Sequence, residues 1–289
     1  MTTQPIVVGV DGSPTGLHAV DLAVREAELR TRPIRVVYAN TWASHPAWVD
    51  VAPSGLVAER LTSQPRQALD EALARIAATG HDVPATGEVL VGNPTAVLVH
   101  ESQWAALLVV GHRGHGGLPL PGLGSVARQV AAHALCPVLV ARGTLDATGE
   151  VLIGVDGSPG NDAAVGFAFE EAALRRTQLL ALHAWTGPIS TGPGDMLPLV
   201  YDLADVAAEE TRVLAEALAG WQAKYPDVTV HRRLVRAHAA RALVEATGRA
   251  QLVVVGTHGH RAVAGWLVGS VTHALLHQAG CPIVVVRQG

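Results

Sequence analysis

The stretch that decides the fold is VVGHRGHGGLPLPGLGSV, residues 109–126. A short apolar run ends at Gly111, Gly114 follows after two residues, and Gly124-Ser125 opens an apolar stretch of helical character. This order of strand, glycine turn, glycine-rich loop and helix start is typical of phosphate sites in α/β proteins. Glycines let the backbone approach an anion closely, and the first N–H groups of the helix face it. The sequence therefore predicts a phosphate-binding loop here.

The same pattern returns 145 residues later, where Gly256, Gly259 and Gly269-Ser270 follow another apolar run. The segment GVDGSP at 9–14 likewise recurs at 154–159. A constant offset along the whole chain indicates two homologous domains. We place them at residues 1–146 and 147–289, joined by a turn-rich segment. Because this link is short, we expect the domains to pack against each other.

Short apolar runs alternate with helical patterns in each half, which predicts parallel strands connected by helices. The predicted strands are 6–10, 34–39, 85–91, 106–110 and 138–141, and then 152–155, 179–184, 229–234, 252–255 and 283–286. Each set of five predicts a doubly wound parallel sheet of order 3-2-1-4-5, flanked by helices. The ligand crevice of such a sheet lies beyond the carboxyl ends of strands 1 and 4.

The last strand of each half is an apolar sheet edge, and exposed edges invite pairing. We therefore expect the two halves to pair through these edges as a pseudo-twofold unit. We also expect two chains to associate further, as a homodimer through edge strands.

Composition narrows the function classes. The 289 residues are 49% hydrophobic, enough for two domains that each bury a core. Aromatic residues are scarce at 4% and the net charge is −4, which argues against nucleic-acid and anionic-membrane partners. Lys224 is the only lysine, so a Walker-type phosphate loop is excluded. The start of the chain resembles no signal peptide and no apolar run is long enough to span a membrane, so we expect a cytoplasmic protein.

The two cysteines, Cys136 and Cys281, occupy equivalent positions in the two halves, and each precedes a proline and an apolar run. We expect them to be reduced, structural and buried in separate cores.

Asp11 and Asp156 each end a first strand, inside the predicted crevice. Such a carboxylate can meet a nucleotide hydroxyl, a base amine or bound Mg²⁺. The alternative is a helix cap or an Asx-turn with the following glycine. Ser125 and Ser270 likewise suit either a helix cap or a phosphate contact, and both possibilities stay open.

Arg113 is a phosphate candidate because it is a permanent cation within the loop, and its counterpart in the second half is His258. His115 and His260 are equivalent and are expected to line the phosphate loops. Histidines are numerous, but ligands converging from several elements are not evident, so no metal site is predicted. Trp42 and Trp185 follow the second strands and are expected to pack beneath the loops.

Together these residues resemble the universal stress protein family, in the tandem form with two such domains in one chain. The pattern Gly-x2-Gly-x9-Gly-Ser occurs twice in register, with Val-Asp-Gly-Ser near each domain start and Cys-Pro near each end. In that family the glycine pattern distinguishes ATP-binding members from those that do not bind nucleotide.

The resemblance implies contacts for each site, position by position. Asp11 and Ala39 would meet the adenosine end in the first domain. The residues implied for its ribose and phosphates are Gly111, Arg113, Gly114, Gly124, Ser125 and Val126. Those implied in the second domain are Asp156, Ala184, Gly256, His258, Gly259, Gly269, Ser270 and Val271. The family often carries glycine and proline after strand 3, as in Gly92-Asn-Pro94, whereas the second half has Ala237-His-Ala239, so the resemblance implies an altered second site.

The function implied is that of a cytoplasmic stress-response regulator that binds ATP with magnesium and acts through its binding state. The alternative is a slow ATPase or a nucleotidyl-transferring enzyme on the same fold. Gly9–Ser13 does not match the Ser-Gly-Gly-x-Asp-Ser loop of adenylating relatives, which weakens that alternative. A third hypothesis is a structural module whose glycine loops merely pack.

Overall fold

The computed structural model describes residues 3–41, 56–115, 122–143, 148–186, 202–257, 259 and 268–287. Strands and helices alternate along the chain as predicted. The elements of the first half are β1 (Ile6–Val10), α1 (Pro14–Arg30), β2 (Ile34–Asn40), α2 (Leu56–Ala78), β3 (Ala85–Val91), α3 (Pro94–Glu101), β4 (Leu107–Gly111), α4 (Ser125–His133) and β5 (Val138–Ala141).

The second half repeats this order, with two additional single 3-10 turns. Its elements are β6 (Glu150–Gly154), η3 (Pro159–Asn161), α5 (Asp162–Leu174), β7 (Leu179–Trp185), α6 (Leu203–Lys224), β8 (Val230–Arg236), α7 (Ala239–Ala246), η4 (Thr247–Arg249), β9 (Ala250–Gly256), α8 (Ser270–Gln278) and β10 (Ile283–Val286). All ten predicted strands form, with their ends shifted by two residues at most.

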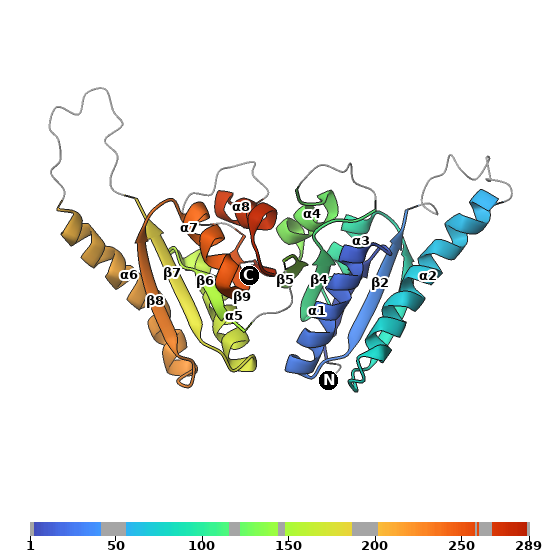
Figure 1. Ribbon diagram of the computed structural model, residues 1–289, viewed down its shortest axis with the longest axis horizontal. Coiled ribbons are helices and arrows are strands. Elements are labelled where there is room, and N and C mark those ends of the chain that lie inside the picture. Colours follow the sequence, from blue (N-terminus) through green and yellow to red (C-terminus); the bar gives the residue numbers. More distant parts are fainter. Residues whose placement is uncertain are drawn as a thin grey trace, which may run out of the picture.

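The strands make one continuous sheet of order β3-β2-β1-β4-β5-β10-β9-β6-β7-β8. Each half has the predicted order 3-2-1-4-5, and all strand pairs within a half are parallel. The halves meet where β5 pairs antiparallel with β10, so the predicted pairing of the two edges is confirmed. Figure 1 shows the result, with α2 and α6 at opposite ends of the molecule.

This pairing bears on the predicted association of two chains. The edges of β5 and β10 are already occupied by each other, so a second chain cannot use them for a dimer. The outer edges of the sheet are β3 and β8, and the middle of each carries exposed residues. Association of two chains through edge strands stays a prediction, and β3 and β8 are the edges that remain for it.

The apolar cores follow the faces of the sheet and not the two halves. One core lies under α1, α2, α5 and α6, and the other lies under α3, α4, α7 and α8. Each core takes residues from both halves because partners across the central pairing, such as Leu139 and Val284, point to the same face.

The prediction of separate cores for the two cysteines is therefore wrong. Cys136 and Cys281 belong to the same apolar cluster. Both are buried and free, as predicted for structural thiols, and burial raises the pKa of each to about 12.

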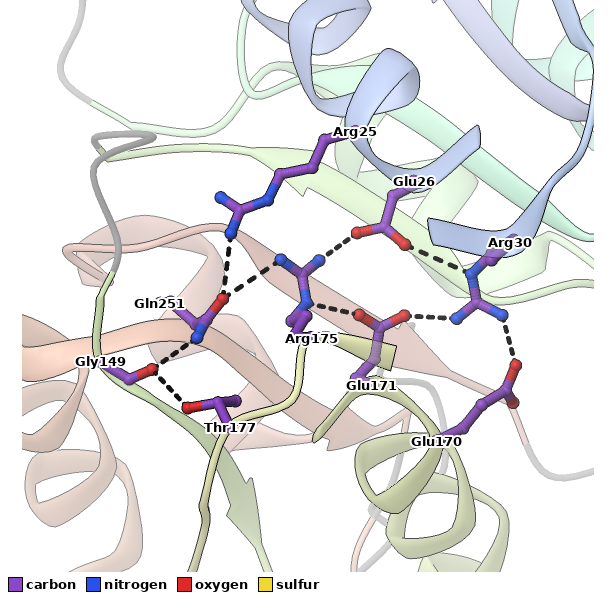
Figure 2. Close-up of polar contacts among 9 residues, drawn as sticks. All are labelled: Arg25, Glu26, Arg30, Gly149, Glu170, Glu171, Arg175, Thr177 and Gln251. Atoms are coloured by element: carbon purple, nitrogen blue, oxygen red, sulfur yellow. Dashed lines mark hydrogen bonds and ion pairs between the residues drawn. The ribbon is translucent and has the colours of Figure 1, made fainter. Parts of the chain in front are cut away.

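A buried polar cluster joins α1 to α5 (Figure 2). Its centre is a ring of four residues, Glu26, Arg30, Glu171 and Arg175, which we call the interdomain ring. Arg30 donates to Glu26 within its own helix and to Glu171 across the interface. Arg175 does the same in reverse, to Glu171 at 2.7 Å and to Glu26. The two pairs are equivalent by the 145-residue repeat, so the ring is closed by the pseudo-twofold relation of the halves.

The polar cluster extends beyond the ring on both sides. Arg30 Nη1 also lies 2.5 Å from Glu170 Oε1, and Gln251 Oε1 accepts from both Arg25 and Arg175 at 3.3 Å. Gln251 Nε2 in turn donates to the carbonyl oxygen of Gly149, where the second half begins its first strand. The two halves are thus held by charge on one face of the sheet as well as by the central strand pair.

Helix ends follow local sequence signals. In α1, Pro14 takes the first helical position and the Ser13 hydroxyl accepts from Gly16 N at 3.1 Å. In α3, Asn93 Oδ1 accepts from the N–H groups of Thr95 and Ala96. No helix within the described ranges combines the length and apolar character of a membrane span.

Candidate functional site

A cavity of about 790 Å³ opens at the carboxyl ends of β1 and β4, where the winding of the first half of the sheet reverses. This volume lies within the range of small-molecule sites. Its lining includes every residue implied for the first site, namely Asp11, Ala39, Gly111, Arg113, Gly114, Gly124, Ser125 and Val126. The structure therefore brings these eight residues together, although they come from three separate segments of the chain.

Asp11 links the two loops that border the cavity. Its Oδ1 accepts from Ser13 N at 3.0 Å, which is the Asx-turn that the sequence left open. Its Oδ2 accepts from His115 N at 2.8 Å, across the crevice. The helix cap of α1 is Ser13 and not Asp11. The carboxylate thus orients the glycine loop, and its side chain is still 40% exposed.

Two glycines of the motif are explained by contacts within the protein. A Cβ at Gly114 would overlap Asp11 Oδ2, and a Cβ at Gly111 would lie 2.8 Å from the carbonyl oxygen of Thr15 in α1. In the second half a Cβ at Gly259 would lie 2.5 Å from Asp156 Oδ2. These glycines let the loop after the fourth strand approach the turn after the first. Sequence reasoning assigned them to phosphate alone.

The start of α4 corrects the interpretation of Ser125. The cap residue is Gly124, Ser125 is the first helical residue, and no side chain caps this end. Gly269 and Ser270 stand in the same way at the start of α8. The cap alternative is therefore wrong for both serines. The amide of Gly124 donates to His112 O at 2.8 Å, which closes the loop onto the strand end.

Arg113 lies in the loop and lines the cavity, and its side chain is hydrogen-bonded to the loop. Arg113 Nε donates to Gly122 O at 2.6 Å, and its own carbonyl oxygen accepts from the Thr15 hydroxyl. His115 also lines the cavity, as predicted, with its Nδ1 3.9 Å from Asp11 Oδ2. His112 instead turns to the strand, donating from Nδ1 to Ala141 O at 2.9 Å, and burial lowers its pKa.

The second half repeats the turn after the first strand. Asp156 Oδ1 accepts from Ser158 N at 2.8 Å, as Asp11 does from Ser13. His183 stands where the first half has Tyr38, and it is buried. Its Nδ1 donates to Val155 O at 2.7 Å and its Nε2 lies 2.8 Å from Glu210 Oε2.

Several predicted residues of the second half and the loops need separate mention. His258, His260 and Trp42 lie outside the described residues. Trp185 is buried at the end of β7 with the Arg236 guanidinium above its ring, while the loop beneath which it was predicted to pack lies outside the described residues. Among the described side chains, no group of three or more histidines, cysteines or carboxylates is arranged to hold a metal ion.

Sequence reasoning missed several lining residues of the first cavity, among them Tyr38, Leu98 and His277. Tyr38 precedes the predicted Ala39 on β2, and Leu98 sits on α3, whose Leu and Val positions read as ordinary core. His277 belongs to α8 of the second half. No local signal could reveal it, because only the pairing of β5 with β10 brings α8 to this cavity.

Comparison with known proteins gives the family. The model described as "Universal stress protein family" matches residues 2–142 and again residues 148–287. A universal stress protein of Mycobacterium tuberculosis is 38% identical over 292 residues, covering 98% of this chain and 96% of the relative. One of Mycolicibacterium smegmatis is 37% identical over 295 residues, covering 99% and 98%. The crystal structure of a universal stress protein from Archaeoglobus fulgidus has the same fold, with a TM-score of 0.71 at 16% identity and full coverage of both chains. The chain therefore belongs to the universal stress protein family, with two such domains in tandem.

Proposed function

We propose that this stress-response protein binds an adenine nucleotide, ATP with magnesium, at one site per domain. The observation that supports the first site best is the cavity at β1 and β4, whose lining contains all eight residues implied by the family motif. Two features that repeat the geometry of the first site support the second. They are the close approach of Gly259 to Asp156 and the start of α8, which no side chain caps.

The chemistry of the first cavity suits an anion at one end. The free N–H groups at the start of α4 and the guanidinium of Arg113 would bind phosphate oxygens. The adenosine end would lie along β2, at Ala39. Asp11 is the one carboxylate among the described lining residues. A single carboxylate fits Mg²⁺, which keeps several waters and is bound by substrate phosphates.

This proposal makes the protein act by its binding state, through its conformation or through partners, with at most slow ATP hydrolysis. The domain arrangement supports a coupled response. The loop that would hold the phosphates is tied by Asp11 to the turn that opens α1, and α1 carries half of the interdomain ring. A ligand that displaced the loop would therefore act on the contact between the domains. Cytoplasmic location and association of two chains stay predictions.

The test is calorimetric titration of nucleotide-stripped protein with ATP and Mg²⁺. Matched variants Ser125→Glu and Ser270→Glu place a carboxylate at the first helical position of α4 and α8. A negative charge at a helix start stabilises the helix, so both variants should fold, while it repels phosphate. We expect two sites in the unchanged protein and loss of one site in each variant.

Each variant serves as the control for the other, because each changes only its own domain. Circular dichroism of both would verify folding. Absence of heat from the stripped and folded protein, with no thermal shift, would overturn the proposal and favour loops that merely pack. Multiple turnovers of ATP by the unchanged protein, absent in an Asp11→Ala and Asp156→Ala double variant, would favour the enzymatic alternative.

A further inference from the structure

The cavity of the first domain is completed by the second domain. His277, near the carboxyl end of α8, lines this cavity together with Arg113 and Gly122. Its ring lies against Gly122, where an added Cβ would come within 3.3 Å of both Cε1 and Nδ1. Gly122 also has a φ of +148°, which favours glycine. A side chain at position 122 would therefore be strained by this φ and would press on the imidazole.

Arg142 fixes α8 in this position. It directly follows β5, and its guanidinium donates to three carbonyl oxygens at the end of α8: Ala279 O at 2.9 Å, Leu276 O at 3.3 Å and His277 O. An arginine at a helix carboxyl end is stabilised by the helix dipole. The place of His277 is therefore set beside the pairing of β5 with β10, which joins the two halves of the sheet.

The groups that face His277 are cationic or neutral. They are Arg142 after β5, Arg128 on α4, His273 on α8 with its ring centroid 4.4 Å away, and Arg113 in the loop. Burial and the first three of these groups lower the pKa of His277. No carboxylate of the described residues contributes to this shift. An anion bound beside these groups would offset their mutual repulsion and would favour a protonated imidazole.

We propose that His277 contacts the phosphates of a nucleotide bound in the first domain, so that the second domain sets the preference of this site for nucleotides over nucleosides. The inference rests on the proposed nucleotide site and names a residue that supplies part of its specificity. The second site would differ, because the residue 145 positions before His277 is Ala132, which carries no polar group.

The test isolates the first site in a Ser270→Glu background. ATP and adenosine are titrated calorimetrically into that protein, with and without His277→Ala. Loss of a charge-assisted hydrogen bond predicts about tenfold weaker ATP binding. Adenosine binding should change less than twofold. Gln278→Ala, on the adjacent exposed residue, is the control and should change neither affinity. His277→Gln keeps a donor and similar volume, and should recover part of the loss.

A pH series separates contact from mere packing. Lowering the pH from 7.5 to 6 should widen the ATP affinity difference between the parent and His277→Ala, because bound phosphate then favours a protonated imidazole, although the pKa of His277 is lowered in the free protein. Equal losses for ATP and adenosine, or no loss for either, would overturn this inference while leaving the nucleotide site intact. Failure of the parent to bind ATP, with Ser125→Glu equally silent, would overturn the proposed function itself.

Discussion

The crevices of the two domains are alike in backbone and different in side chains. Asp11 with Gly114 and Asp156 with Gly259 make the same close approach. Around that shared frame the side chains change: buried His183 replaces Tyr38, and α8 brings His277 to the first cavity where the repeat offers only Ala132 to the second. The close backbone approach restricts which residues can occupy the shared loops. Side chains that come from the other half are not restricted in this way and can differ between the two crevices. The repeat therefore yields two crevices that are unequal in their side chains.

The interdomain ring is the opposite case, because its equivalent residues make equivalent ion pairs. Replacing Glu171 by alanine removes this equivalence, and we expect it to cause the largest loss of unfolding free energy. Glu171 is fully buried between Arg30 and Arg175, and removing one member of a buried ion pair costs about 3–5 kcal/mol of unfolding free energy. Urea unfolding measures the cost.

Glu170→Ala is the matched control, because Glu170 also meets Arg30 but its side chain is 43% exposed. An exposed pair contributes at most about 1 kcal/mol. Equal losses in the two variants would show that the ring does not hold the domains.

The two ring glutamates should also differ in their response to pH. Burial and the charge of Glu171 raise the pKa of Glu26 to about 7. Burial also disfavours charge on Glu171, but the charges of Arg175 and Arg30 outweigh it and lower its pKa. A raised carboxyl pKa means that the folded state holds the proton more tightly than the unfolded state. The stability from Glu26 is then fully present below its ordinary pKa of 4.5 and is lost as the pH rises to about 7.

The measurement is the free energy of unfolding across that pH window. The unchanged protein should lose up to about 3 kcal/mol more than Glu26→Gln, which cannot titrate. Identical slopes in the two proteins would refute the assignment to Glu26.

Arg142 and Arg287 are equivalent by the repeat. Their substitutions test the contact between the two halves, with a smaller expected loss of stability. Arg142 makes three hydrogen bonds to the end of α8, whereas Arg287 makes one to the described part of the chain, with His133 O at 3.4 Å. We expect Arg142→Ala to cost about 2 kcal/mol and Arg287→Ala less than about 0.5 kcal/mol, measured by thermal unfolding. A larger cost for Arg287→Ala than for Arg142→Ala would contradict this difference between the two equivalent arginines.

The smallest effect concerns the helix starts after the third strands. Asn93 caps α3 with two hydrogen bonds, but His238 makes no side-chain bond at the start of α7. Asn93→Ala should cost about 1 kcal/mol and His238→Ala a few tenths at most. Chemical denaturation of the two variants side by side gives the comparison, and equal costs would count against a capping role for Asn93.

Sequence reasoning was strongest where local pattern and repeat agree. The strands, their order and the grouping of Asp11, Ala39 and the glycine loop follow from apolar runs and the 145-residue offset. The sites themselves stay predictions. The role of Gly114 could not be foreseen, because its neighbour Asp11 is distant in the chain and the clash appears only in three dimensions.

Other features could not be predicted because they arise only where the two halves contact each other. Glu26 and Arg30 stand four residues apart on a helix, a spacing that also occurs in exposed ion pairs. Only the approach of α1 to α5 buries them. Cys136 and Cys281 share a core for the same reason, since a continuous sheet joins what two separate domains would keep apart.

The central place of β10 has a consequence for synthesis of the chain. β5 is complete once Ala141 has been made, but its partner begins only at Ile283. At a synthesis rate of about 5–20 residues per second, the apolar edge of β5 stays unpaired for roughly 7–30 seconds. A chain interrupted in the second half leaves this edge bare, and another interrupted chain can pair with it. Completion of the last strand therefore converts a site of misassembly into the middle of the sheet.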